Sequence, residues 1–347
     1  MKNNAKKTKK LLPLAVLLAA AALLGILLAV LTRSSTDAAD TTIPLCGFTA
    51  EEIDRLAYSG NNMDVTLLKG STGDWMLDSD PALPLDQEKV TSLVEQYAAL
   101  AALRKLEGSD LAELPEKSAA PQMTITIGAG DKTLALTVDQ LNAVADVYYV
   151  YDESGAAYTV MRSDLATLSK SPRDLYKAQT LTDKTLSDVA AMQVNDLQFT
   201  QTDGSWTLTD DPDYPVSQSS IKKMASTILQ MQTAWTVTAP EADTAYGLDS
   251  PDVTAVLTFT DGTSLTVRFG NAVAAAADGS DGDSLCYLAS DAAPTVVYEV
   301  NADSKLAYAV TKESLYEETA TAETAASDPV AQYPVGGEDD YADSLPE

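Results

Sequence analysis

The sequence contains no histidine and only two cysteines, Cys46 and Cys286, among its 347 residues. The lack of histidine excludes a Ser-His-Asp triad, a Cys-His dyad and a histidine-ligated zinc site. Two cysteines cannot build a disulfide framework, and whether they pair in an exported compartment or remain buried thiols stays open. The chain also lacks a Gly-x-x-x-x-Gly-Lys loop, and Gly128-Ala129-Gly130 lacks the third glycine of a dinucleotide fingerprint. We therefore expect no cofactor and no metal centre.

Basic residues are scarce outside the N-terminus. Lysine and arginine number 23 against 51 aspartates and glutamates, and five of the lysines fall within residues 1–10. The chain beyond the first 32 residues holds 18 basic and all 51 acidic residues, a net charge of −33. Such a charge repels nucleic acid and anionic lipid head groups, and it keeps an exported protein soluble. We therefore expect no nucleic-acid partner.

The one long uncharged run, residues 11–32, follows the lysine-rich start. A helix of this length would span about 33 Å, enough to cross the hydrocarbon core of a bilayer. The alternative is a cleaved secretory signal, although the apolar region of such signals is usually only about 7–15 residues long. Because positive flanks stay inside, residues 1–10 are predicted to be a cytoplasmic tail, with the chain from Arg33 onward extracytoplasmic. Residues 33–45 would be a linker.

The C-terminal end differs in composition from the rest of the chain. Residues 313–347 contain ten acidic residues, no lysine or arginine, and few large apolar side chains. Such a segment buries too little apolar surface to offset its ordering entropy, so we expect a disordered acidic tail. Whether this tail docks on a partner or only solvates the protein stays open.

Between these ends the chain repeats itself at an offset of 131 residues. GDWMLDSDPALP begins at Gly73 and GSWTLTDDPDYP at Gly204, and seven of the 28 positions from Gly73 to Leu100 are identical. Apolar residues then recur at helical spacing in both halves: Val90, Leu93, Val94, Tyr97 and Leu100 match Ile221, Met224, Ala225, Ile228 and Met231. This spacing predicts an amphipathic helix in each half, with Asp86 and Ser217 as N-caps.

Short alternating runs typical of strands surround each predicted helix. They lie at residues 63–70, 122–128, 132–138, 147–151 and 156–161, and at 195–201, 253–259, 263–270, 285–289 and 295–300. With the Trp-x-Leu strand, each half is predicted to be β-β-α-β-β-β-β, and Thr260-Asp261-Gly262 is a hairpin turn. We expect an α+β protein of two tandem repeats, residues 46–178 and 179–312, each a mainly antiparallel sheet with one helix.

This pattern resembles the bacterial domain-of-unknown-function family 4340. The second half carries the fuller set of matching residues: Gly204, Trp206, Pro212, Pro215, Tyr246, Gly247, Leu248, Asp249, Pro251 and Asp261-Gly262-Thr263. The first half keeps Gly73, Trp75, Pro81, Pro84 and Asp86. It lacks the Tyr-Gly-Leu sequence at residues 111–121, where we expect a different loop. Residues 174–181, DLYKAQTL, resemble the junction between units of the family.

The resemblance implies an exported, membrane-tethered protein without assigned catalytic residues. Members of the family often occur alongside ABC-type export systems related to gliding-motility transporters. An accessory role next to such a transporter is therefore implied by association and not by chemistry.

Trp75, Trp206 and Tyr246 are the candidate binding residues. Each tryptophan could serve as an aromatic platform for a sugar or a peptide. The alternative is that it packs on the helix of its own unit, with its indole N–H satisfied locally. Because both tryptophans occupy the same internal position, the sequence favours packing.

Other candidate sites carry weaker signals. Asp80 and Asp211 each precede a proline. The Asp-Pro sequence is typical of a turn, and this interpretation is favoured over a catalytic acid–base pair. Residues 219–223 contain Ser-x-x-Lys twice, but the Ser-Asp-Asn and Lys-Thr-Gly elements of penicillin-binding enzymes are absent. The aspartates of residues 277–284 lack EF-hand spacing, which favours a hairpin connection over a calcium site.

The sequence therefore predicts a non-enzymatic, membrane-anchored extracytoplasmic protein that binds or scaffolds. Its expected partners are the membrane, through a single helix, and ABC-type transporter subunits or other envelope proteins. The alternative is a cell-envelope module that binds glycan or peptide. An exported hydrolase is the third hypothesis.

Overall fold

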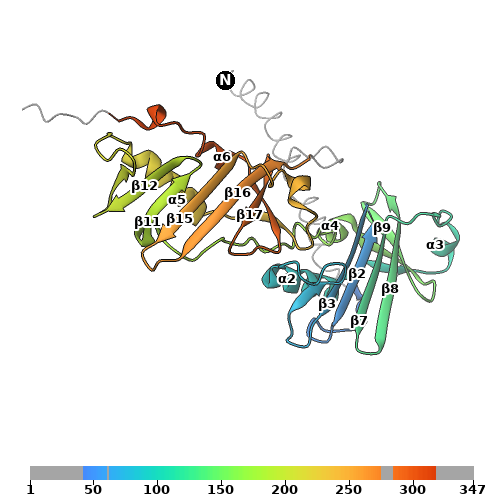
Figure 1. The fold of residues 1–347 in the computed structure, drawn as a ribbon. Coiled ribbons are helices and arrows are strands. Elements are labelled where there is room, and N and C mark those ends of the chain that lie inside the picture. Colours follow the sequence, from blue (N-terminus) through green and yellow to red (C-terminus); the bar gives the residue numbers. More distant parts are fainter. Residues whose placement is uncertain (1–41, 61, 275–283, 318–347) are drawn as a thin grey trace, which may run out of the picture.

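The computed structural model describes residues 42–60, 62–274 and 284–317. These residues form two eight-stranded antiparallel sheets with few helices, an α+β-like arrangement. Figure 1 shows the sheets as two lobes, the first coloured blue to green and the second yellow-green to orange. Within the described ranges, no helix has both the length and the apolar character needed to span a bilayer. The predicted membrane span, residues 11–32, and most of the predicted acidic tail lie outside those ranges.

The first sheet has the strand order β4-β3-β2-β7-β8-β9-β10-β6. Its strands, in chain order, are β2 (Arg55–Gly60), β3 (Met63–Lys69), β4 (Trp75–Leu77), β6 (Arg104–Leu106), β7 (Met123–Ala129), β8 (Lys132–Asn142), β9 (Val147–Asp152) and β10 (Ala157–Met161). A separate two-stranded ladder joins β1 (Ile43–Pro44) to β5 (Ala101–Ala102). The helices of this half are α2 (Gln87–Ala98), α3 (Ser109–Ala112) and α4 (Arg162–Ala166).

The second sheet has the order β13-β12-β11-β15-β16-β17-β18-β14. Its strands are β11 (Val189–Val194), β12 (Leu197–Thr202), β13 (Ser205–Leu208), β14 (Thr233–Val237), β15 (Val253–Phe259), β16 (Ser264–Ala272), β17 (Leu285–Ser290) and β18 (Val297–Asn301). Its helices are α5 (Gln218–Leu229) and α6 (Asp303–Leu306), with short 3-10 turns η1 (Leu186–Asp188), η2 (Asp243–Tyr246) and η3 (Glu313–Leu315). Strands at corresponding points along the chain occupy corresponding positions in the two sheets.

Each sheet has more strands than the sequence analysis predicted. Three strands precede the long helix instead of two, because β2 and β11 lie between the predicted hairpin and the strand β7 or β15. A further strand, β6 or β14, follows the helix and forms one edge of the sheet. The prediction β-β-α-β-β-β-β was therefore wrong by two strands in each half. Alanine, glycine and polar residues within RLAYSG and VAAMQV dilute the apolar alternation that identifies strands.

The two long helices were predicted correctly, and each covers one face of its sheet. Asp86 caps α2 by accepting hydrogen bonds from the amides of Glu88 and Lys89, and Ser217 accepts one from Ser220 at the start of α5. The predicted helix face is buried in both halves, and it packs against alternate residues of the sheet strands. Because each helix brings its apolar face to its own sheet, each half has a separate hydrophobic core.

Candidate functional site at the junction of the two sheets

Trp75 and Trp206 lie inside the two hydrophobic cores, with exposed fractions of 6% and 1%. A glutamine at the start of each helix holds the strand that carries the tryptophan. Gln87 accepts a hydrogen bond from the amide of Trp75 at 2.7 Å and donates to its carbonyl at 3.0 Å, and Gln218 does the same to Trp206 at 2.8 Å in both cases. The tryptophan strand is thereby joined to the helix that covers it.

Neither indole ring offers a free face to a sugar or a peptide in this conformation, because both rings are covered by core residues. The hydrogen bonds from the two glutamines satisfy the backbone amide and carbonyl groups of the tryptophans and not their indole nitrogens. Among the described residues, the indole N–H of Trp206 has no hydrogen-bond partner. The expectation of a locally satisfied indole N–H was therefore wrong for Trp206.

Tyr246 belongs to a small apolar cluster on the outer face of the second sheet, together with Leu248, Ala289 and Val297. Its ring lies edge-on to Tyr287 at 4.8 Å, and its hydroxyl accepts a hydrogen bond from the amide of Glu241. Gly270 lies directly beneath, where an added Cβ would collide with the carbonyl of Tyr246. The Tyr-Gly-Leu sequence thus holds a loop tightly against the sheet.

The corresponding loop of the first half is built differently, as expected from its missing Tyr-Gly-Leu sequence. The amide of Ser118 donates to both carboxylate oxygens of Asp139 at 3.2 Å, and Asp139 is only 3% exposed. Lys117 lies 3.8 Å from the ring centre of Tyr151 in the same loop region. A buried carboxylate therefore fixes this loop in place of the aromatic residue.

The remaining candidate residues lie apart from one another. Asp80 accepts a hydrogen bond from Thr238 at 2.7 Å, whereas Asp211 pairs with Lys312 at 2.8 Å. Ser219 and Ser220 hydrogen-bond to the N-cap Ser217. No group of three or more acidic or cysteine side chains in the described part of the chain could hold a metal ion. Most of the aspartate-rich loop 277–284 lies outside the described residues.

Cys46 and Cys286 are free thiols, one in each core. Burial raises the pKa of both thiols above the ordinary range for cysteine. A thiol with a raised pKa is a poor nucleophile, because only the thiolate attacks. Both cysteines therefore act as small core residues.

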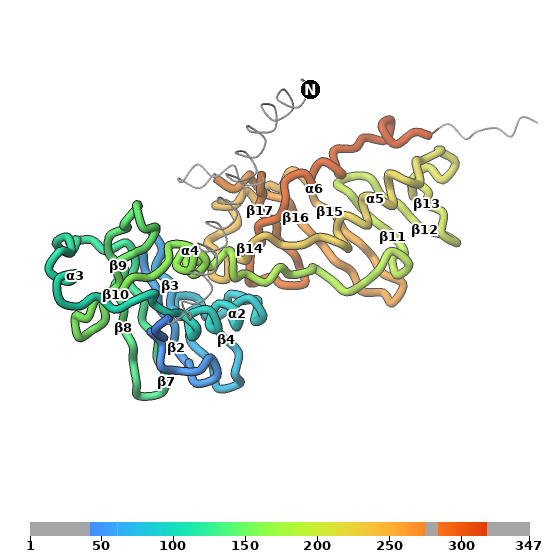
Figure 2. Tube along the Cα trace, turned by 180° about the vertical axis from the view of Figure 1, so that it is seen from behind, coloured from blue at the N-terminus to red at the C-terminus, as the bar shows by residue number. Residues whose placement is uncertain are grey.

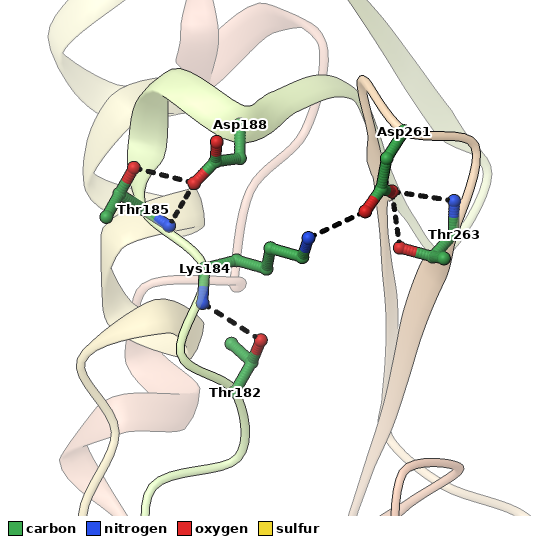
Figure 3. Close-up of polar contacts among 6 residues, drawn as sticks. All are labelled: Thr182, Lys184, Thr185, Asp188, Asp261 and Thr263. Atoms are coloured by element: carbon green, nitrogen blue, oxygen red, sulfur yellow. Dashed lines mark hydrogen bonds and ion pairs between the residues drawn. The ribbon is translucent and has the colours of Figure 1, made fainter.

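The turn at Asp261-Gly262-Thr263, which is one of the matches to the family pattern, connects the start of the second half to its sheet (Figure 3). Asp261 accepts hydrogen bonds from the amide and hydroxyl of Thr263 and pairs with Lys184 at 2.6 Å. Lys184 and Thr263 together hold the pKa of Asp261 well below its usual range. On the other side of Lys184, Asp188 accepts two hydrogen bonds from Thr185. This corner orders the chain as it enters the second sheet.

Buried polar side chains concentrate where the two halves meet, and this junction is the candidate functional site. The segment that joins the halves, residues 171–177, runs alongside the first half beside the start of α2. The amide of Asp86 donates to the carbonyl of Leu175 at 2.8 Å, and the amide of Lys177 donates to that of Pro84 at 2.9 Å. Figure 2 shows this segment passing between α4 and β14.

Tyr176 connects this segment to the second half. Its hydroxyl lies 2.6 Å from the hydroxyl of Thr233 and 2.7 Å from that of Thr236, both on the edge strand β14. The amide of Gln179 donates to the hydroxyl of Thr233 as well. Thr233 and Thr236 are 2% and 5% exposed, and the Tyr176 ring is tilted against Trp235 at 5.3 Å.

Arg173 and Glu299 form a second connection at the junction. Glu299 has only 6% of its side chain exposed, and Nη2 of Arg173 donates to its Oε1 at 3.1 Å and lies 2.9 Å from its Oε2. The 2.9 Å contact is an ion pair without hydrogen-bond geometry. The guanidinium also stacks 4.8 Å from the ring centre of Trp235, which itself packs against the core of the first half.

These contacts give the junction a structural role. A buried carboxylate that loses its partner is costly, and a buried tyrosine hydroxyl needs its acceptors and donors. Arg173 and Tyr176 contact groups on the second sheet, while their neighbours Leu175 and Lys177 are hydrogen-bonded to the first half, so the segment fixes one half against the other. The sequence analysis noticed the segment DLYKAQTL but singled out neither residue, since their partners lie more than 50 residues away.

The end of the second half repeats the backbone geometry of this joining segment. The amide of Ser217 donates to the carbonyl of Leu315 at 2.8 Å, and the amide of Glu317 donates to that of Pro215 at 3.0 Å. Tyr316 thus corresponds to Tyr176, yet Tyr316 is 53% exposed whereas Tyr176 is 5% exposed. The difference arises because β14 covers Tyr176.

Comparison with known proteins gives one match. No curated protein and no solved structure was found to be similar. The family model described as "Domain of unknown function (DUF4340)" matches residues 26–205, just over half of the chain. The match covers the first sheet and the junction segment and ends at β13 of the second sheet. The chain therefore belongs to the DUF4340 family of domains of unknown function.

Proposed function

We propose that this chain is a non-enzymatic scaffold of the cell envelope, anchored in the membrane by residues 11–32, with its two sheets outside the cytoplasm. The support is the lysine-flanked apolar run and the high acidity of the remaining chain. Residues 46–178 and 179–312 would be tandem copies of one module. The 131-residue sequence offset and the matching strand orders support this duplication.

The observation that carries the scaffold role is the junction between the sheets. Thr233, Thr236 and Glu299 are buried polar groups, and each accepts or shares a hydrogen bond with the joining segment. Two modules joined by a free linker would need none of these contacts. A fixed spacing between two surfaces suits a protein that positions other subunits better than one that turns over a substrate.

The proposed partner is an ABC-type exporter related to gliding-motility transporters, or other envelope proteins associated with it. This part of the proposal rests on the family resemblance and on the predicted location at the membrane. The transport machinery would supply the chemistry, and this chain would hold or align its extracytoplasmic parts.

Crosslinking in intact cells tests the accessory role. A photo-crosslinking residue at an exposed position of each sheet, such as Thr200 and Thr124, should recover transporter subunits after detergent extraction. A chain lacking residues 1–32 but carrying a cleavable export signal is the matched control, because it retains both sheets without the anchor. Failure to recover any transporter subunit with the anchored chain would overturn the accessory role.

A further inference from the structure

The turn that joins β8 to β9 in the first sheet, residues 143–146, has an apolar tip. Val144 is fully exposed, at 101%, and the alanines on either side of it are exposed as well. The side chain of Asn142 accepts hydrogen bonds from the amides of Val144 and Ala145, at 3.2 and 3.1 Å. This turn therefore has a defined shape that holds a valine out into solvent, at a place where turns usually carry glycine, asparagine or aspartate.

The chain enters the first sheet at the same end. Strand β1 pairs with β5, and β5 leads directly into Leu103. Leu103, Asn142 and Ala145 line one cavity of about 230 Å³, so the apolar turn lies close to β5. The residues that lead back to the predicted membrane span, 33–41, therefore precede a strand at the end of the sheet that carries the turn.

The length of that segment limits how far this end of the sheet can lie from the bilayer. An extended chain spans at most about 3.6 Å per residue, so the ten steps from Thr32 to Thr42 cover no more than roughly 36 Å. In the anchored state, so short a tether keeps β1 and the neighbouring turn near the membrane surface. It raises their local concentration there, so that an apolar contact too weak to hold free molecules together is sufficient.

The turns at the opposite end of the first sheet are acidic. The turns between β7 and β8 and between β9 and β10 lie there, and they carry the exposed Asp131 and Glu153. In the apolar turn the carboxylate of Asp146 lies 3.9 Å from the guanidinium of Arg162. The short helix α4 at this end supplies one base and one acid, Arg162 and Asp164. An anionic bilayer surface therefore repels the Asp131 end more strongly and favours approach of the apolar turn.

We propose that the turn 143–146 contacts the head-group region of the membrane that holds the anchor, with the side chain of Val144 buried among the upper acyl chains. Burial of an apolar side chain at this depth is favourable in proportion to the area removed from water. The inference rests on the proposed anchor and deepens the scaffold role. With the turn on the bilayer, the first sheet would stand on the membrane, and the junction would hold the second sheet at a constant orientation.

Fluorescence quenching in the full-length chain tests this contact. Ala143→Cys carries a small fluorophore in a chain whose buried cysteines are replaced, reconstituted in vesicles of phosphatidylcholine and phosphatidylglycerol. Lipids spin-labelled in the upper acyl chain should remove most of the fluorescence. The same fluorophore at Asp131→Cys, in a turn at the opposite end of the same sheet, is the matched control and should keep most of its fluorescence.

Two further variants test the valine itself. In the chain labelled at position 143, Val144→Asp should remove most of the quenching, because a carboxylate resists transfer out of water. Val144→Leu should retain the quenching. The valine is fully exposed, so both substitutions should leave the fold intact, which circular dichroism checks.

Each other outcome has a distinct meaning. Equal quenching at positions 143 and 131, or quenching that survives Val144→Asp, would overturn the inference. Absence of quenching in a chain that floats with the vesicles would overturn it and leave the anchor in place. A photo-crosslinker at position 143 that recovers a transporter subunit, without quenching, would assign the turn to a protein partner instead of lipid. A chain that does not float with the vesicles would remove the proposed anchor and this inference together.

Discussion

Single residues in this protein decide how loops and turns lie against the sheets. Gly270 admits the carbonyl of Tyr246 where any side chain would collide, and Asp139 fixes the corresponding region of the first half through the amide of Ser118. Asp261 combines two roles, since it stabilises its own turn through Thr263 and holds the entry of the second half through Lys184. The contacts of Asp261 lie at the surface and involve charged groups, so they respond to pH.

The Lys184–Asp261 pair gives a pH-dependent prediction. Lys184→Gln should raise the pKa of Asp261, because the hydrogen bond from Lys184 is the largest cause of its low value. A folded-state pKa below the unfolded value, about 3.9, stabilises the protein above that pH, and the contribution is lost as pH falls through the folded pKa. The difference in stability between wild type and variant should therefore disappear on acidification.

Carboxyl-carbon NMR titration measures this change directly. Asp188 provides the internal control, because the amide and hydroxyl of Thr185 are the main causes of its lowered pKa. Its pKa should move less than that of Asp261. An unchanged Asp261 titration in the Lys184→Gln variant would show that Thr263 alone sets it.

At the scale of elements, side chains join strands, helices and connecting segments by hydrogen bonds to the backbone or side chains of a neighbouring element. Gln87 and Gln218 connect each tryptophan strand to its helix. The hydroxyl of Tyr176 joins the segment between the halves to β14, through Thr233 and Thr236. Because these groups are shielded from water, each lost bond leaves partners unsatisfied.

Tyr176→Phe tests the junction with an unusually close control. The variant should lower the free energy of unfolding by about 1–3 kcal/mol, because it leaves the two threonine hydroxyls at a buried site with fewer partners. Tyr316→Phe removes the same atom from the corresponding, half-exposed position and should change stability by less than about 0.5 kcal/mol. Chemical denaturation measures both variants. Equal effects would mean that the junction hydroxyl contributes nothing specific.

At the scale of the whole molecule, the junction decides whether the sheets act as one body or two. The ion pair of Arg173 and Glu299 and the ring of Trp235 lie between elements of both halves. Removal of Arg173 leaves a carboxylate that is almost fully buried without its counter-charge, which favours opening of the junction and entry of water.

Arg173→Ala should therefore broaden the distribution of distances between the two sheets. Spin labels at exposed Thr124 and Thr200, one on each sheet, report this distribution by pulsed electron resonance of a chain whose buried cysteines are replaced. Arg162→Ala is a suitable control, because Arg162 pairs only loosely with Asp146, at 3.9 Å, within the first half. A distribution as narrow as that of the wild type would show that the hydroxyl contacts suffice.

Much of the architecture was predictable from the sequence, because it depends on local patterns. The helices at residues 87–98 and 218–229, their caps and the predicted strands follow from apolar spacing and turn residues within a few positions of each other. The burial of Trp75 and Trp206 in equivalent places follows the packing alternative. The strands β2, β6, β11 and β14 were missed, since their short or diluted patterns become strands only through their neighbours.

The sequence by itself determined the acidity, the lack of histidine chemistry, the apolar run near the N-terminus and the repeated helix-and-strand pattern. Only the tertiary structure decided which residues join the halves, because Arg173 and Tyr176 meet partners 126 and 57 residues away. It also decided that Tyr176 is covered while Tyr316 is exposed, although the two turns share their backbone bonds. Local patterns specify elements, whereas burial of a polar side chain depends on which distant surface comes to cover it.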